Sequence, residues 1–222
     1  MATSGSSSNF NLNWKAVALV VLIGAAWAFI YRSVTSGGLD LDPFQALGRG
    51  AGLATARLLN NSGRIVLVDA SFGQYTVLAP TTEVQIKAFK KGIGRTGLKV
   101  VAEEKVTISP PSLSRTGIFM EPGQLSKLIR QHKDVDALVL FVGLASPEEL
   151  EGARPNGKKP KLVLVANYEP YYKLLVQSRL IQLAIVPRKA SETNGTAAGT
   201  PQSNFDQNYL VMTPENVAQL PD

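Results

Sequence analysis

Short apolar runs alternate with amphipathic segments over residues 63–187. The runs are rich in β-branched residues, as buried strands are, and the segments between them repeat apolar positions at the helical period of about 3.6 residues. The predicted strands are 64–70, 98–106, 137–144, 162–168 and 180–186, and the predicted helices are 82–94, 123–133 and 169–179. The run 137–144 is continuously apolar and predicts a central strand. This alternation favours an α/β fold with one three-layer, doubly wound, mostly parallel sheet of about five strands, or six if 209–214 returns as an edge strand.

Two of the predicted helices have clearly separated faces. In 82–94, Thr82 and Gln85 have the spacing of a capping box. Its inward positions are predicted to be Val84, Ile86, Phe89 and Ile93, and its outward positions Lys87, Lys90, Lys91 and Arg95. In 123–133, one face at the 0, 3, 4, 7 spacing holds Leu125, Leu128, Ile129 and His132. The single histidine is therefore expected in the core or at its boundary rather than in catalysis.

Two further segments flank this pattern. A helix is predicted to begin at Asp42 and Pro43 and to stop near Asn60, Asn61 and Gly63, because these residues are typical of helix ends. Its glycines, Gly48, Gly50 and Gly52, weaken it. It is expected either to pack on the domain or to lie near a bilayer. Residues 189–207 are low in complexity and are predicted to be a flexible loop.

The N-terminal region predicts a membrane anchor. Residues 1–13 are rich in Ser and Asn and are expected to be a disordered tail, and 14–32 is predicted to be a transmembrane helix. Its apolar run from Trp14 to Tyr31 would span about 27 Å as a helix, close to the hydrocarbon thickness of a bilayer. Trp14, Trp27 and Tyr31 would lie at the headgroups, and Lys15 and Arg32 would extend outward. The alternative is a cleaved signal peptide, since Ala-Trp-Ala at 26–28 loosely resembles a cleavage site.

The chain is therefore expected to contain a tail, an anchor, a linker with a juxtamembrane helix over 33–62, and an α/β domain over 63–222. A short tail before a large domain favours a single-pass protein with the tail inside and the domain on the extracytoplasmic, periplasmic side. Positive charges at the two ends of the apolar run are nearly balanced, so they do not fix this direction.

Composition excludes several kinds of chemistry. The chain has no cysteine and one histidine, which rules out disulfides, thiolate catalysis and the usual zinc sites. The net charge is +6, but the basic residues are spread along the chain without a nucleic-acid-binding motif. No nucleic acid, metal or cofactor is expected. A solvated surface explains most of the charge, and lipid headgroups or an acidic partner are the nearer specific partners.

Candidate site residues come from the rule that an open parallel sheet binds ligands beyond the carboxyl ends of its strands. These positions are Asp69, Ser71, Phe72, Glu103, Asn167 and Tyr168. Asp69 or Glu103 would bind a ligand amine and an aromatic side chain would stack. Alternatively, Asp69 caps a turn and the aromatic residues pack the sheet edge. Glu103 and Glu104 are neighbours in a strand, so they point to opposite faces and cannot form an acid/base pair. The G-x-G-x-x-G spacing over 92–97 follows a helix instead of opening one, so it does not indicate a dinucleotide site, and no enzyme is expected.

The stretches EVQIKAFKKGIGRTGLKVVAEEKV and GQLSKLIRQHKDVDALVLFVG, together with the turn VDASFGQY, resemble a lobe of the type 1 periplasmic binding proteins. The style is that of the branched-chain amino-acid receptors of ABC importers. The matching positions include Ala88, Phe89, Gly92, Gly97, Asp136 and Gly143, within residues 63–187. Such receptors close two lobes on a ligand, whereas this stretch has room for one lobe.

Two functions follow from the resemblance and the anchor. The first is a non-catalytic, membrane-anchored accessory protein that docks on a larger membrane complex or associates with itself. The alternative is a solute-binding module for a small amino-acid-like or carboxylate ligand.

Overall fold

A six-stranded sheet in the order β2-β1-β3-β4-β5-β6 forms the middle layer of the structure. The computed structural model describes residues 41–71, 79–108, 119–144, 159–165, 172–188 and 201–219. The strands are β1 (Ser62–Ser71), β2 (Gly97–Thr107), β3 (Ala137–Leu140), β4 (Lys161–Val165), β5 (Leu183–Pro187) and β6 (Tyr209–Met212). The pairs from β2 through β5 are parallel and β6 is antiparallel to β5, so the mostly parallel α/β sheet, the central place of β3 and the sixth edge strand are confirmed.

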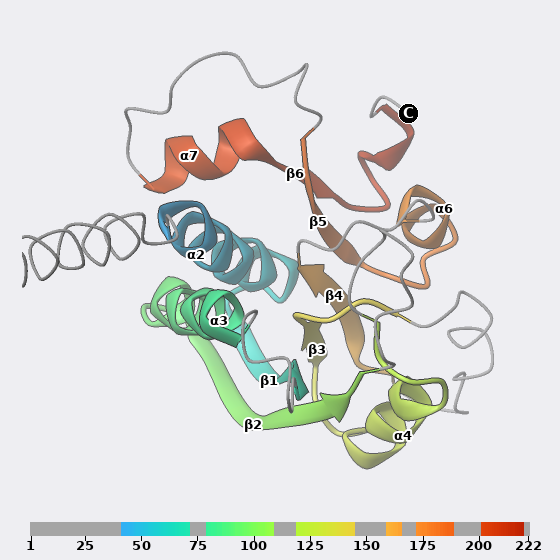
Figure 1. Ribbon diagram of the computed structural model, residues 1–222. Coiled ribbons are helices and arrows are strands. Elements are labelled where there is room, and N and C mark those ends of the chain that lie inside the picture. The colour runs from blue at the N-terminus through green and yellow to red at the C-terminus, as the bar shows by residue number, and fades with distance from the viewer. Residues whose placement is uncertain are drawn as a thin grey trace, which may run out of the picture. The chain divides into compact units, whose positions relative to one another are not determined.

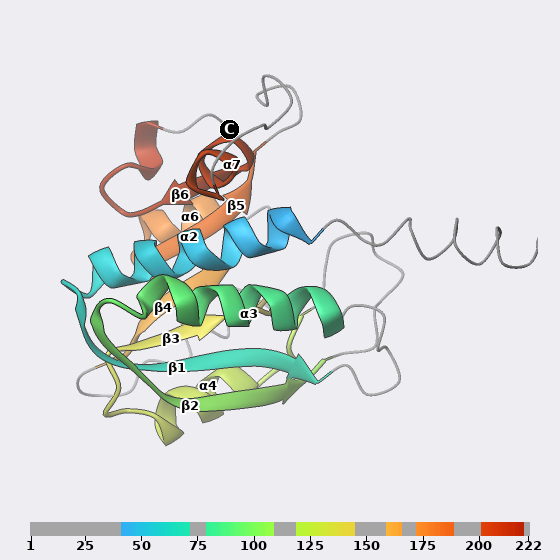
Figure 2. The ribbon, with the colours of Figure 1, turned by 90° about the vertical axis from the view of Figure 1, so that its left-hand side faces the viewer.

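Helices cover both faces of this sheet, which completes the predicted three layers. They are α2 (Asp42–Leu58), α3 (Ala79–Ile93), α4 (Gln124–Gln131), α6 (Tyr172–Gln177), α7 (Pro201–Asn208) and the short 3-10 helix η3 (Val217–Gln219). Figure 1 shows α2, α3 and α7 on one side of the sheet and α4 and α6 on the other. Figure 2 shows α2 and α3 running side by side, with β1 and β2 below them.

Each face of the sheet has its own apolar core. On the α4 side the core contains Val66, Val68, Leu138 and Leu140 with Leu125, Leu128 and Ile129 of α4. On the α2 side it contains Ile65, Leu67, Val139 and the edge-to-face pair Phe89–Phe141, whose ring centroids are 5.8 Å apart. Alternate residues of one strand therefore supply the two cores, as the pleat of a strand requires.

Helix α2 lies against α3 as part of the unit that contains the sheet, Leu41–Asp222. Of the two places predicted for this helix, packing on the domain is the one observed. Its glycines allow the close approach: a Cβ on Gly48 would collide with the backbone carbonyl of Gln85, and one on Gly52 would lie 2.7 Å from the carbonyl oxygen of Phe89. The same residues that lower the intrinsic helix propensity thus determine how closely α2 and α3 pack.

The capping-box prediction in α3 is wrong. The helix begins at Ala79, so Thr82 is a buried residue of its first turns rather than the cap. The predicted facing is confirmed for Phe89 and Ile93, which are buried, and for the four basic residues, which are exposed, whereas Val84 and Ile86 are only half-buried. Strand β5 also begins later than predicted, because the amide of Leu180 donates to Leu175 O and the amide of Ile181 does the same, which keeps both residues in the exit from α6.

The predicted loop 189–207 is wrong over its last part. Residues 201–208 form α7, and Phe205 is buried against α2, where its ring occupies the space that a side chain on Gly50 would need. Phe205 also stacks on Tyr209, with ring centroids 5.7 Å apart. The contact between Phe205 and Gly50 holds this polar segment against α2. Amino-acid composition does not reveal such a contact.

The predicted tail and anchor, residues 1–32, lie outside the described residues, as do the linker residues up to Asp40. Within the part of the chain that the structure describes, no helix is long and apolar enough to cross a bilayer. The anchor therefore stays a prediction.

Candidate functional site

The strand order creates a switch point between β1 and β3. From β1 the chain crosses through α3 to β2 on one side, and then through α4 to β3 on the other side. In open α/β sheets, ligands bind beyond the carboxyl ends of the strands where the winding direction reverses. The carboxyl ends of β1 and β3 are therefore the place to look for a site.

Asp69 lies near the carboxyl end of β1, directly opposite Lys105 of β2 in the strand register. Its Oδ1 accepts a hydrogen bond of 2.7 Å from the amide of Ala70, so the predicted turn-capping type of contact is present. The side chain is partly buried. Burial raises the pKa of the Asp69 carboxyl; the Ala70 hydrogen bond and Lys105 oppose this, and the nearby carboxylates of Glu83 and Glu103 add to it. The Asp69 carboxyl is therefore a hydrogen-bond acceptor that is partly removed from water and lies near two other carboxylates.

Glu103 and Glu104 lie on opposite faces of β2, as predicted. Glu103 pairs with Lys90 of α3 at 2.7 Å, and Glu104 contacts Nε2 of His132, at the end of α4, at 2.9 Å. Because Glu103 is already paired with Lys90, this carboxylate is a weaker ligand for an amine than Asp69. His132 is mostly shielded, with 14% of its side chain exposed, so it occupies the boundary position predicted for it.

A β-bulge decides which glutamate faces which helix. Between Ile65 and Val66 of β1, the register on β2 moves from Val100 to Ala102, which leaves Val101 unpaired. The extra residue reverses the facing of everything after it: Leu98 and Val100 pack on the α2 side, whereas Ala102 and Val106 pack on the α4 side. Without the bulge, Glu103 would point toward α4 rather than toward Lys90.

The other candidate residues are placed only in part. The backbone of Ser71 ends β1 and pairs with Thr107. Phe72, Asn167 and Tyr168 lie outside the described residues. The segments 72–78 and 166–171 directly follow β1 and β4, and 109–118 and 145–158 come soon after β2 and β3. All four segments also lie outside the described residues.

Sequence reasoning missed a segment at this same edge. The amide of Met120 donates to Gly143 O at 3.0 Å, and the amide of Glu121 donates to Thr107 O at 3.2 Å. The side-chain amide of Gln124 makes two further bonds to the backbone of Thr107, of 3.1 and 3.0 Å. Residues 119–124 thus connect the carboxyl end of β2 to the continuation of β3. The sequence gives little indication of this segment. The one available sign is Gln124 at the start of α4, whose side-chain amide can donate to and accept from a strand backbone as a neighbouring strand would.

Two cavities lie away from this edge. One of about 290 Å³ is at the amino end of β4, near α4 and α6, and its lining includes Lys159, Lys161 and Arg179. The other, of about 300 Å³, lies between α2, α7 and β6, and its lining includes apolar residues such as Leu53 and Phe205 and the charged residues Arg57, Asp206 and Glu215. Within the described ranges, no group of acidic or histidine side chains could hold a metal ion.

Known proteins resemble this chain in fold rather than in sequence. No family model and no curated protein matches it. Among solved structures it is similar to AraP, an arabinose-binding protein from Geobacillus stearothermophilus, with a TM-score of 0.53 at 15% identity over 81% of this chain and 63% of that one. It is also similar to the fructose-binding periplasmic domain of a hybrid two-component system, with a TM-score of 0.52 at 16% identity over 80% and 58% of the two chains. A third similar structure is a XylFII–LytSN complex, with a TM-score of 0.52 at 14% identity over 78% and 60%.

These similarities confirm the fold part of the resemblance: the chain has an α/β fold similar to that of periplasmic sugar-binding proteins. The chain spans less than two thirds of the length of each of these three structures. Two of these three structures are named for sugars, and nothing in the comparisons supports the branched-chain amino-acid receptors in particular.

Proposed function

We propose that this chain is a non-enzymatic, ligand-binding module that recognises a small polar molecule at the carboxyl ends of β1 and β3. The observation that carries this proposal is Asp69, a partly buried carboxylate beside the switch point, whose pKa is raised first of all by burial. Burying a carboxylate in this way costs folding stability. Groups with perturbed pKa values are common at functional sites, so a ligand-binding role would account for its presence.

The charges around Asp69 restrict the class of ligand. Glu83 and Glu103 both act on Asp69 as neighbouring negative charges, with Lys105 as the opposing positive charge. A carboxylate ligand would be repelled there, so we disfavour the carboxylate among the ligands expected from the sequence. A neutral polyol such as a sugar, or a molecule with an amine, can donate hydrogen bonds to Asp69. The sugar-binding proteins of similar fold favour the polyol.

The proposal includes the predicted location. The segment Trp14–Tyr31 would hold the module at a membrane, and the module would lie on the extracytoplasmic side. The similar structures include a periplasmic domain of a signalling protein, which supports a sensing role at a membrane surface.

A docking role is the second candidate. The described residues form one sheet, so a ligand at its edge would be covered from one side only. In two-lobed receptors a second lobe closes over the ligand. A second copy of this chain, or a subunit of a membrane complex, would have to supply that cover. The mass of the particle purified from native membranes in detergent checks this role, and a lone monomer would count against it.

The ligand-binding role is tested by thermal denaturation of the full-length chain in detergent. The panel contains arabinose, glucose, fructose, leucine and citrate. We expect a neutral sugar or an amine to raise Tm and citrate to leave it unchanged, because a ligand that binds only the folded state stabilises that state.

Two variants make the test specific to the site. Asp69→Asn should abolish the ligand-induced shift, whereas Asp134→Asn, the same exchange at an exposed position before β3, should keep it. If no member of the panel shifts Tm, or if the shift survives in Asp69→Asn, the proposed site is wrong.

A further inference from the structure

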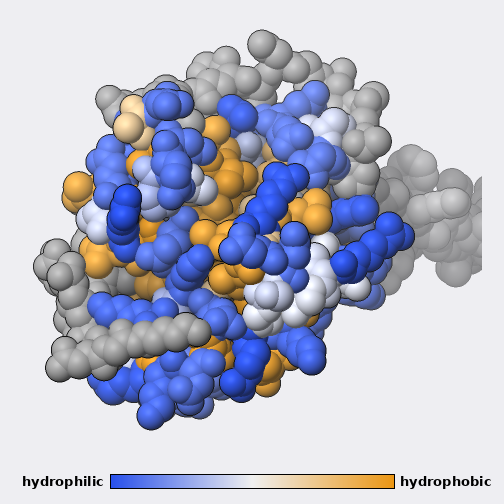
Figure 3. Space-filling model, turned by 180° about the vertical axis from the view of Figure 1, so that it is seen from behind, coloured by the Kyte–Doolittle hydropathy of each residue, from blue (hydrophilic) through white to orange (hydrophobic). Residues whose placement is uncertain are grey.

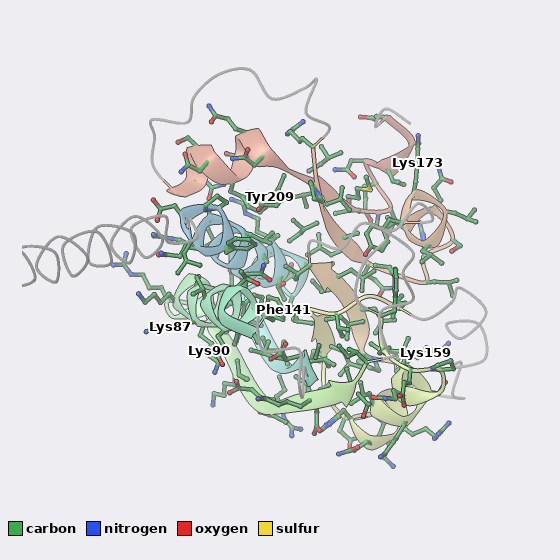
Figure 4. All side chains as sticks on the ribbon, in the orientation of Figure 1. Lys87, Lys90, Phe141, Lys159, Lys173 and Tyr209 are labelled. Atoms are coloured by element: carbon green, nitrogen blue, oxygen red, sulfur yellow. The ribbon has the colours of Figure 1, made fainter. Side chains whose placement is uncertain are left out.

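A basic cavity lies at the amino ends of the strands, opposite the proposed ligand site at their carboxyl ends. Its volume is about 290 Å³ and it opens at the amino end of β4. Its lining combines three cations with an apolar floor; the residues are Ile129, Lys159, Pro160, Lys161, Leu162, Arg179, Leu180 and Gln182. Figure 4 shows Lys159 beside α4, on the other side of the sheet from Lys87 and Lys90 of α3.

The three cations come from two separate segments that the fold brings together. Lys159 precedes β4, Lys161 is its first residue, and Arg179 follows α6. The ammonium of Lys161 donates to Leu58 O at 3.0 Å, which fixes its position. Within the described residues, the ion pairs within 4 Å are Lys90–Glu103 and His132–Glu104, so none of the three cavity cations is paired with a described carboxylate.

Arg179 has a backbone conformation that arginine rarely adopts. Its φ is +58°, in the left-handed region. The amide of Arg179 donates to Val176 O and that of Leu180 to Leu175 O, which is the Schellman pattern that ends many helices. Glycine is the usual residue at that position because it has no Cβ. An arginine here carries a strain that glycine would avoid, so the strain itself does not explain why arginine is present.

The simplest alternative is that these cations balance the negative ends of nearby helices. That explanation suits basic residues in a last helical turn, such as Arg57 and Arg130. It also suits Lys161, whose ammonium donates to the carbonyl of Leu58, the last residue of α2. It does not suit Lys159, which precedes β4. The carbonyls at the end of α6 are also occupied, since the Schellman bonds use two of them and Nε2 of Gln182 donates to Arg179 O at 2.8 Å.

The positive field of the cavity reaches a neighbouring carboxylate. The pKa of Glu215 is lowered, chiefly by a hydrogen bond with the side chain of Thr213, and the charges of Arg179 and Lys161 contribute to the shift. Glu215 is exposed and is not among the cavity residues, so it partly offsets the field without filling the site.

We infer that this cavity is a second binding site, for a small organic phosphate. Lys159 and Arg179 match a dianionic head, Lys161 adds positive charge beside them, and Ile129, Leu162 and Leu180 offer an apolar floor to the body of the ligand. The volume is at the lower end of that of small-molecule sites. This inference stands independently of the proposed ligand site, because the two lie at opposite ends of the strands.

Calorimetric titration of the full-length chain with phenyl phosphate tests the inference. Phenol has the same ring without the charge, and inorganic phosphate has the charge without the ring. We expect phenyl phosphate to bind most tightly, inorganic phosphate more weakly and phenol not at all. Raising the salt concentration should weaken the binding of both anions.

Variants separate the cavity from a general attraction by a basic protein. Arg179→Gly should weaken phenyl phosphate binding about tenfold or more, while its Tm stays equal to or above that of the parent chain. Lys159→Gln should weaken binding similarly. Lys87→Gln removes the same charge on α3 and should leave the affinity unchanged, and Glu215→Gln should tighten it slightly.

Three outcomes would overturn the inference. The first is equal affinity for phenol and phenyl phosphate. The second is an equal loss in Lys87→Gln and Lys159→Gln, which would show attraction by net charge alone. The third is binding to vesicles that contain phosphatidic acid without binding to phenyl phosphate, which would indicate a membrane surface instead of a soluble ligand.

Discussion

The environment of Asp69 indicates a binding site more clearly than any sequence motif in the chain does. The carboxylate is partly buried, its one described hydrogen bond comes from the amide of the next residue, and an asparagine oxygen could accept that same bond. The structure therefore gives Asp69 no folding task that requires a negative charge. Arg179 is similar, because glycine would satisfy its backbone better. Each of these residues is costly for folding and suited to binding.

The first prediction concerns the charge of Asp69. Its pKa is raised in the folded chain, above the usual value of about 3.9. The folded state thus binds the proton more tightly than the unfolded state, and the stability linked to that proton is present at low pH and is lost as pH rises through the folded-state pKa. Asp69→Asn should therefore be more stable than the parent at neutral pH, by less than about 1 kcal/mol because solvent screens the half-exposed group.

Urea denaturation of both chains at about pH 7 and about pH 3 checks this, since the difference should vanish where Asp69 is protonated in both states. Asp134→Asn, the same exchange at an exposed position, serves as the control. A neutral-pH loss of stability in Asp69→Asn would show that the negative charge supports the fold.

At the scale of elements, hydrophobic periodicity was enough to predict the sheet and most of the helices. The strand at 137–144 is a clear case, because a continuous apolar run in an alternating βα chain has to be buried on both faces. Tertiary contacts account for the errors. The order of 201–208 depends on Phe205 meeting Gly50, and the start of β5 depends on hydrogen bonds to the end of α6. Neither contact leaves a periodic signal.

The candidate site was predictable to a smaller degree. Counting residues from the strand ends located Asp69 and the opposite facing of Glu103 and Glu104. It could not assign Glu103 to Lys90, because the extra residue at Val101 decides that facing. A one-residue bulge reverses the side of every later residue in the strand. The basic cavity was missed altogether, since it joins residues that lie apart in the sequence.

The close contact between α2 and α3 gives the second prediction. A methyl group on Gly48 would collide with the Gln85 carbonyl, which is backbone and cannot rotate away. Gly48→Ala should therefore destabilise the chain by about 1–3 kcal/mol despite the better helix propensity of alanine.

Arg49→Ala is the matched control, because it changes an exposed neighbour on the same helix and should stay within about 0.5 kcal/mol. Thermal and urea denaturation measure both effects. If Gly48→Ala were stabilising, α2 would have room to move away from α3 and the close packing would not be needed for stability.

At the scale of the whole molecule, the parallel strands separate two chemically different edges. The chain enters α2 at Asp42, on the edge where β1 ends (Figure 2), and that edge holds the acidic group around Asp69. Figure 3 shows the molecule from behind, where hydrophilic side chains surround a hydrophobic strip. The basic cavity opens where β4 begins. From Arg64 to Ser71, β1 alone spans about 23 Å at about 3.3 Å per residue, so the two edges lie well beyond direct contact.

This separation leads to the last prediction, that the two edges act independently. Substitutions more than about 10 Å apart without shared partners usually add within about 0.5 kcal/mol. Asp69→Asn, which removes a desolvated charge, and Arg179→Gly, which relieves a left-handed backbone worth about 1 kcal/mol, should each stabilise the chain at neutral pH. The double variant should show the sum of the two gains in urea denaturation. It should also lose the sugar-induced and the phosphate-induced responses, while each single variant loses only its own.

A coupling above about 1 kcal/mol, or a loss of phosphate binding in Asp69→Asn alone, would mean that the sheet transmits a change from one edge to the other. The two sites would then have to be treated as one linked system.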